Sequence, residues 1–307
     1  MKPAATFSEL LQRFFTDRLM RECNASPLTI ANYRDAFCLL IAYFQRCLKK
    51  PPTKIGIEDL NAPLITRFLD YLEQERGNSP RSRNVRLAAI HSFFSFVELN
   101  EPAAGAVAQR VLAIQSKRCA KTPVDFLNRA ESEAIISAPN QATGSGRRDR
   151  TLLLVALQTG LRVAELIGLR CQDVVLETGA HVRCTGKGRK TRCIPLRKEV
   201  AAALRRWLCE RNGKPTDAVF PNARGQSLSR DGVQYILTRH VKAACEKCPS
   251  LKSKRVSPHV LRHSAAMDLL QNGVDRSVIA LWLGHESMNS TQVYLHASLE
   301  LKEKALA

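Results

Sequence analysis

Apolar residues recur every three or four positions through the first third of the chain, which is the spacing of one face of a helix. The clearest run starts at Ser26 and Pro27, which are typical of a helix N-cap and first turn. Its apolar positions are Ile30, Tyr33, Phe37, Leu40, Phe44 and Cys47. Further helices are predicted over residues 6–20, from an Asn61 cap to Gly77, and from Ser79 onward. Four such helices are enough for a small bundle.

The pattern breaks at "QSKRCAKTP", residues 115–123, which is basic, has no periodicity and ends in proline. We therefore expect a domain over residues 1–115, a linker over 116–123 and a second domain over 124–307. Helical patterns return at 198–211, 229–246, 258–271 and 275–283. Between residues 173 and 196, short β-prone runs predict a small antiparallel sheet, with its last hairpin turning at Gly186–Lys190. The expected fold class is mainly α with this small sheet.

The net charge of the chain indicates what kind of partner it binds. The 307 residues carry a net charge of +19, with 15 Lys+Arg against 11 Asp+Glu in residues 1–115 and 32 against 17 in the rest. Such an excess usually marks a polyanionic partner, most often nucleic acid; a solvated basic surface or anionic lipid are the alternatives. The sequence contains no evident basic amphipathic helix with bulky apolar anchors, so lipid is the weaker alternative. The sequence has no apolar run long enough to span a membrane and starts without an export signal, so a cytoplasmic protein is expected.

The ten cysteines form no disulfide framework, and we expect reduced thiols, several of them buried. One "CEKC" pair, Cys245 and Cys248, has the spacing of two zinc ligands. A zinc site needs four, and no second pair exists; His240 or His259 would complete it only by chance of folding. We expect no metal site.

Three short stretches place reactive side chains beside turn or cap signals. In "LQTGLRVAELIGLR", Arg162 follows a helix that ends at Gly160, and Glu165 lies three residues on, within reach if a helix resumes. In "SPHVLRHSAAMDLL", His259 and Arg262 share one helix face near the positive end of the helix dipole. Each pattern is also compatible with an ordinary corner or capped helix.

The third stretch is "ALWLGHESMNSTQVYLH", in which Gly284 ends an apolar helix and His285 comes next. Tyr294 follows nine residues later. A lone tyrosine is more often a packing residue than a nucleophile. His263, beside Arg262, is interpreted as structural.

Taken together, Arg162-x-x-Glu165, Lys187 in the hairpin, His259-x-x-Arg262, Leu283-Gly284-His285 and Tyr294 stand in an order and spacing that resemble the tyrosine recombinase (phage integrase) family. The compact layout is similar to that of Xer-type members. The resemblance is close over roughly residues 125–300. It implies a helical core-binding domain followed by a catalytic domain, and a site-specific recombinase that acts on double-stranded DNA as a homo- or hetero-tetramer on two sites.

The same resemblance implies the role of each residue. Tyr294 would attack the scissile phosphate, Arg162 and Arg262 would clamp it, and Lys187 would protonate the leaving oxygen. His259 would accept the tyrosine proton, His285 would bind a phosphate oxygen and Glu165 would support the site. Neither ATP nor a metal is expected, because transesterification conserves the phosphodiester bond energy. Candidate DNA contacts are the basic residues Arg81, Arg83, Arg86, Lys117, Arg118, Lys121, Arg189 and Lys190.

Two other functions remain open from the sequence. A type IB topoisomerase would nick and rejoin DNA without a partner site, and a DNA-binding protein could have lost catalysis. The full set of six candidate catalytic residues disfavours the second. Nothing in the sequence gives the DNA target, because base readout depends on side chains at an interface that the pattern does not place.

Overall fold

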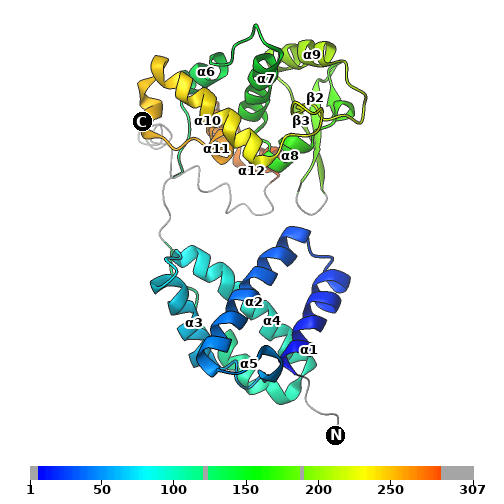
Figure 1. The fold of residues 1–307 in the computed structure, drawn as a ribbon. Coiled ribbons are helices and arrows are strands. Elements are labelled where there is room, and N and C mark those ends of the chain that lie inside the picture. Colours follow the sequence, from blue (N-terminus) through cyan, green and yellow to red (C-terminus); the bar gives the residue numbers. More distant parts are fainter. Residues whose placement is uncertain (1–5, 120–123, 187–189, 285–307) are drawn as a thin grey trace. The chain divides into compact units, whose positions relative to one another are not determined.

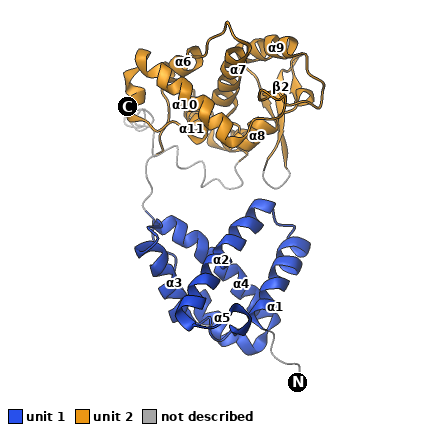
Figure 2. Ribbon diagram, viewed as in Figure 1, with its two compact units in different colours: residues 1–121 blue, residues 122–307 orange. Residues whose placement is uncertain are grey.

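The computed structural model describes residues 6–119, 124–186 and 190–284 (Figure 1). The chain divides into two compact units, residues 1–121 and 122–307 (Figure 2), and this division falls inside the segment expected to be the linker. The predicted fold class, mainly helical with a small antiparallel sheet, is confirmed.

Unit 1 (residues 1–121) is a helical bundle. Its elements are α1 (Phe7–Arg13), the π-helical segment η1 (Phe14–Glu22), α2 (Pro27–Leu48), η2 (Pro52–Lys54), α3 (Ala62–Gln74), α4 (Pro80–Asn100), η3 (Pro102–Ala104) and α5 (Gly105–Leu112). The predicted caps are present, since the side chains of Ser26, Asn61 and Ser79 each accept a backbone N–H from the first turn of their helix. The sequence pattern did not predict α5, which starts at a glycine and has no side-chain cap.

Aromatic side chains hold unit 1 together. Phe14 is fully buried, and its ring centre lies 5.5 Å from that of Phe93 in an edge-to-face arrangement. Phe37 contacts Phe93 in the same geometry at 5.3 Å. Because these rings come from η1, α2 and α4, they join distant segments of the bundle. Rings of this kind dominate core energetics through their large buried area.

Unit 2 (residues 122–307) is built around the buried helix α7. Its elements are α6 (Arg129–Ser137), α7 (Gly144–Thr159), α8 (Val163–Gly168), η4 (Cys171–Asp173), β1 (Val174–Val175), β2 (His181–Thr185), β3 (Thr191–Pro195), α9 (Lys198–Arg211), α10 (Arg230–Lys247), η6 (Pro249–Ser253), α11 (Pro258–Gln271) and α12 (Arg276–Leu283). α7 packs against α6, α9 and α11 (Figure 1).

The three strands form an antiparallel sheet in the order β1-β2-β3. Val182 of β2 is paired with Ile194 of β3, and both side chains are fully buried, so this face of the sheet lies on the core. At the end of the β2–β3 hairpin, the Gly186 N–H donates to the Lys190 carbonyl at 2.9 Å. This bond agrees with the predicted turn, whose central residues 187–189 lie outside the described residues.

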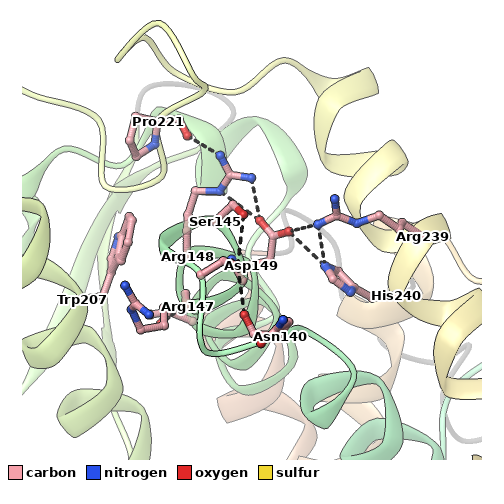
Figure 3. Close-up of polar contacts among 12 residues, drawn as sticks. Asn140, Ser145, Arg147, Arg148, Asp149, Trp207, Pro221, Arg239 and His240 are labelled. Atoms are coloured by element: carbon pink, nitrogen blue, oxygen red, sulfur yellow. Dashed lines mark hydrogen bonds and ion pairs between the residues drawn. The ribbon is translucent and has the colours of Figure 1, made fainter.

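A buried carboxylate links α7 to α10 (Figure 3). Asp149 is fully buried; its Oδ1 accepts from Arg148 at 2.7 Å, and its Oδ2 accepts from Arg239 at 2.7 Å and contacts His240 Nε2 at 2.9 Å. Burial alone would raise the pKa of Asp149, but hydrogen bonds from His240 and Arg148 outweigh burial and hold the pKa below its usual value. The carboxylate is therefore charged, and it ties two helices together inside unit 2.

The cysteines depart from one expectation. All ten are free thiols, but only Cys184 is buried, whereas we expected several. Burial raises the pKa of the Cys184 thiol to about 11. Six of the others are exposed: four lie on the solvent side of a helix or strand, Cys23 caps the end of η1 and Cys119 lies in the segment after α5. Among the described residues, no helix is both long and apolar enough to cross a membrane.

Candidate active site

The turn between α7 and α8 positions Arg162. Gly160 ends α7 in the left-handed region, with φ of 61°, and Arg162 then stands at the N-cap of α8. The helix does resume, and this brings Glu165 within reach. The Arg162 N–H donates to Glu165 Oε2 at 2.8 Å, and its guanidinium Nη1 donates to Oε1 at 3.0 Å. The spacing of these two residues in the sequence thus corresponds to a direct ion pair.

Arg192 on β3, which was not among the site residues predicted from the sequence, binds the same carboxylate. Its guanidinium donates to both oxygens of Glu165, at 3.0 Å and 2.9 Å, and its Nε donates to the Trp282 carbonyl at 3.0 Å. A signal was present in the sequence: alternation along β3 places Arg192 on the same face as Ile194, which is fully buried. An arginine on the core face of a strand indicates a buried acidic partner, because buried charges are paired.

Glu165 is ionised in this setting. Burial would raise the pKa of the carboxyl group, but the hydrogen bonds from Arg192 and from the Arg162 backbone outweigh burial and lower it. Glu165 carries one negative charge, and Arg162 and Arg192 carry one positive charge each. The three residues therefore keep one net positive charge at the surface where Arg162, about one-third exposed, meets solvent.

Arg262 reaches the same place from α11. Its side chain is buried, at 5% exposure; Nη1 donates to the Gly160 carbonyl at 2.7 Å and Nη2 to the Leu283 carbonyl at 2.7 Å. His259, one turn earlier on α11, is exposed. His263 is half-buried, and burial, together with the neighbouring charges of His259 and Arg262, lowers its pKa to about 4. His263 is therefore neutral at physiological pH.

The three arginines converge on the carboxyl end of α12. Arg192 binds the carbonyl of Trp282, Arg262 that of Leu283, and Arg162 that of Gly284 at 2.9 Å. These carbonyls lie at the end of the helix, where the backbone lacks intrahelical partners and the helix dipole is negative. Guanidinium groups from three elements thus fix the point at which the chain leaves α12.

Two glycines allow this close packing. A Cβ at Gly160 would lie 2.6 Å from Leu283 Cδ2, and Gly160 also has positive φ. Gly284 has φ of 65°, and a Cβ there would lie 2.8 Å from Arg192 Nη1. Only glycine fits such positions without displacing a neighbour or straining the backbone. Both glycines were predicted from the sequence as helix ends: Gly160 lies two residues before Arg162, and Gly284 directly precedes His285.

Several predicted site residues lie outside the described residues: Lys187, His285, Tyr294, Lys121 and Arg189. Of the other DNA candidates, Arg81, Arg118 and Lys190 are exposed and Arg86 is half-buried. The exposed Lys117 side chain binds Glu73 at 2.5 Å.

Arg83 does not fit the expectation of a DNA contact. Its side chain is buried at 4% exposure, lies 3.7 Å from Glu73 and donates to the Gln115 carbonyl at 3.3 Å. The reason is helical spacing, since Arg83 shares the inward face of α4 with Leu87 and Ile90.

Comparisons with known proteins agree with this arrangement. Residues 125–300 match the model of the phage integrase family, and residues 11–100 match the phage integrase N-terminal SAM-like domain. The chain is 53% identical over 307 residues, its whole length and 92% of the relative, to the putative integrase/recombinase y4rC of Sinorhizobium fredii. It is 31% identical over 289 residues, 92% of this chain and 91% of the relative, to the tyrosine recombinase XerD of Pseudomonas putida.

Solved structures show the same fold. The XerH site-specific recombinase bound to a difH substrate aligns with a TM-score of 0.71 at 24% identity, covering 92% of this chain and 80% of that one. The integrase of the transposon Tn1549, in complex with a circular intermediate DNA, aligns with a TM-score of 0.72 at 17% identity, covering 97% and 98%. From the family match over more than half its length, and from its similarity to XerD, the chain belongs to the phage integrase family, as a Xer-like tyrosine recombinase.

Proposed function

We propose that this chain cuts and rejoins duplex DNA at specific sites through a covalent 3′-phosphotyrosyl link to Tyr294. The observation that supports the proposal most directly is the meeting of Arg162 and Arg262. They are 100 residues apart in the sequence, yet their guanidinium groups bind the adjacent carbonyls of Gly284 and Leu283. Two arginines held this close suit a single phosphate, because each can offer forked, charge-assisted hydrogen bonds to its oxygens.

The chemistry demands such a pair. The Tyr294 oxygen forms a bond to phosphorus while the bond to the 5′ oxygen breaks, and negative charge builds on the two non-bridging oxygens. One pre-oriented donor to that charge contributes about 3 kcal/mol to the transition state. The Arg162–Glu165–Arg192 cluster keeps one net positive charge, and Arg262 adds a second.

Proton transfers complete the reaction. A tyrosine hydroxyl has an unperturbed pKa of about 10, so a base must accept its proton during attack. The exposed imidazole of His259, on the helix that also carries Arg262, is the proposed acceptor. Lys187 is the proposed donor to the departing 5′ oxygen, and His285 the proposed partner of a non-bridging oxygen. Since the phosphotyrosyl bond retains the energy of the broken phosphodiester, rejoining needs no ATP.

The DNA-binding surface is proposed from charge. Residues 116–307 carry 32 Lys+Arg against 17 Asp+Glu. The candidates for phosphate contacts are three exposed residues: Arg81 and Arg118 in unit 1 and Lys190 in unit 2. Arg83 is left out because its side chain is buried. With residues 1–115 as the core-binding domain, we propose that four protomers assemble on two sites and exchange strands through a Holliday junction.

Trapping of the covalent intermediate tests the proposal. The substrate is target DNA with a nick a few nucleotides from the scissile phosphate. After cleavage, the short fragment that carries the 5′ hydroxyl diffuses away, so the strand cannot be rejoined and the protein stays attached to the DNA. Wild type is expected to form the adduct and Tyr294→Phe to form none while binding the DNA with unchanged affinity. Tyr235→Phe is the matched control, because Tyr235 is 68% exposed on α10, and it is expected to form adduct at the wild-type rate.

The choice of nucleophile is wrong if Tyr294→Phe still forms adduct. Loss of adduct in both variants would indicate a general effect of removing a hydroxyl group. Relaxation of supercoiled plasmid that lacks any target site would favour topoisomerase activity over recombination.

A further inference from the structure

Three chain segments that belong to the proposed site meet at one side chain. Arg192 lies on β3, Glu165 on α8 and Trp282 on α12. The guanidinium of Arg192 binds both oxygens of Glu165 and, through Nε, the Trp282 carbonyl, at 2.9–3.0 Å. Three of its five N–H groups are thus used in fixed directions. No phosphate contact is needed to explain this residue, whose side chain is 14% exposed.

We propose that Arg192 is a positioning residue, which sets the charge and orientation of Arg162 and fixes the exit of the chain from α12. The proposal rests on the role of Arg162 given above. It adds a residue that acts through Glu165 and through backbone carbonyls, and that does not touch the DNA.

Arg192 affects the charge that Arg162 offers to the substrate. Arg162 Nη1 lies 3.0 Å from Glu165 Oε1. With Glu165 as its only charged neighbour, the positive charge of Arg162 would be cancelled before a phosphate arrived. Arg192 occupies the same carboxylate with two hydrogen bonds, so the cluster retains one net positive charge for the substrate.

Arg192 also fixes the orientation of the Glu165 carboxylate. Arg162 Nη1 donates to the same Oε1 atom of Glu165 that accepts from Arg192 Nη1. Glu165 therefore has no freedom to turn toward Arg162 alone. Carboxylate and guanidinium form planar, forked contacts, and a lysine cannot replace such a contact because it offers a single point charge.

The backbone approaches the Arg192–Glu165 ion pair closely at two glycines. A Cβ at Gly284 would lie 2.8 Å from Arg192 Nη1. A Cβ at Gly186, just after β2, would lie 2.9 Å from Glu165 Oε1 and 3.1 Å from Arg192 Nη1. The backbone on both sides of the ion pair is thus packed directly on it. A shift of the guanidinium would move the chain just before His285 and the hairpin just before residue 187.

The test measures single-turnover cleavage with saturating protein on two substrates. One carries the normal scissile phosphate. In the other, a methyl group replaces one non-bridging oxygen, so the linkage is neutral and no longer needs an arginine to balance that charge. The variants are Arg162→Ala, Arg192→Gln and Arg192→Lys. Arg197→Gln is the matched control, because Arg197 forms one exposed ion pair with Asp268 just after β3.

On the normal phosphate, Arg192→Gln is expected to cleave about 10²-fold more slowly, the scale of an active-site misplacement of about 1 Å. DNA affinity is expected to stay within about threefold of wild type, because Arg192 makes no DNA contact. On the neutral substrate, the defects of Arg162→Ala and Arg192→Gln are both expected to shrink at least tenfold. Arg197→Gln is expected to match wild type on both substrates.

Arg192→Lys keeps the positive charge and removes the forked pair of hydrogen bonds to Glu165. It therefore distinguishes an effect on folding from an effect on the position of Arg162. It is expected to melt near the wild-type temperature and still to cleave slowly. Full activity of Arg192→Lys would overturn the proposal, since charge alone would then suffice.

Two further outcomes also count against it. If the neutral substrate relieves Arg162→Ala and leaves Arg192→Gln and Arg192→Lys equally slow, Arg192 serves only the fold, and the proposed function stands without this inference. If the neutral substrate does not relieve Arg162→Ala, the role of Arg162 fails first and the positioning role of Arg192 fails with it.

Discussion

Replacing Asp149 by asparagine removes the charge that joins α7 to α10 while keeping the size of the side chain. The carboxylate is fully buried and accepts from Arg148, Arg239 and His240 (Figure 3). An asparagine offers one acceptor oxygen, and its NH₂ group would face N–H donors. Arg148, whose side chain is 15% exposed, would keep its bond to the Pro221 carbonyl at 2.8 Å but lose its counter-charge.

The expected loss follows from this burial. Removing one partner of a buried ion pair costs about 3–5 kcal/mol, because the remaining charges stay buried without compensation. Arg239 is half exposed and can turn to water, so the cost falls on Arg148 and His240. For a unit of this size, about 2–4 °C of melting temperature corresponds to 1 kcal/mol, and we therefore expect Tm to fall by about 10 °C.

Tryptophan fluorescence during urea or thermal unfolding measures the effect in unit 2 alone, because both tryptophans, Trp207 and Trp282, belong to residues 122–307. Asp268→Asn is the matched control. Asp268 pairs with Arg197 at the surface, with both side chains at least half exposed, and such pairs contribute at most about 1 kcal/mol.

The pH dependence gives a second readout. Because the pKa of Asp149 is lowered in the folded state, its contribution is complete above the unfolded value of about 3.9 and is lost as pH falls through the folded value. The gap between wild type and Asp149→Asn should therefore narrow below about pH 4. Equal losses for Asp149→Asn and Asp268→Asn at pH 7 would show that burial does not strengthen the Asp149 ion pairs.

Two further predictions concern the site. Gly160→Ala should destabilise unit 2 by about 1–3 kcal/mol more than Gly273→Ala in urea unfolding. Both glycines have positive φ, but only at Gly160 would a Cβ meet Leu283. Equal losses of stability would show that Leu283 moves aside without cost. Lys187→Ala should cleave normal DNA slowly and regain speed on a substrate with sulfur at the 5′ bridging position, because a thiolate leaves without a proton. Absence of that rescue would exclude Lys187 as the acid.

Local chemistry made much of the fold predictable. The ranges 198–211 and 258–271, expected from periodicity, are those of α9 and α11. Capping explains part of this success, since Ser257 accepts the Val260 N–H at the start of α11. The Arg162–Glu165 contact was predictable for the same reason: both residues lie in one turn, so their spacing alone brings them together.

Long-range pairing set the limit of prediction. Arg192 binds Glu165 and Trp282, which are 27 and 90 residues away, and no local pattern encodes such partners. The Asp149–His240 contact spans 91 residues. The prediction of a DNA contact by Arg83 rested on its clustering with Arg81 and Arg86, which suggested a basic surface. Its spacing to Leu87, however, places Arg83 on the buried face of α4.

In the proposed reaction, the phenol oxygen of Tyr294 becomes bonded to the phosphorus of the cut strand. Protease digestion of the trapped covalent complex, followed by mass spectrometry of the peptide that retains nucleotide, identifies the residue that carries the DNA. We predict one modified peptide, with the 3′ phosphate of the DNA on Tyr294. Attachment to any other residue, or through the 5′ end of the DNA, would contradict it.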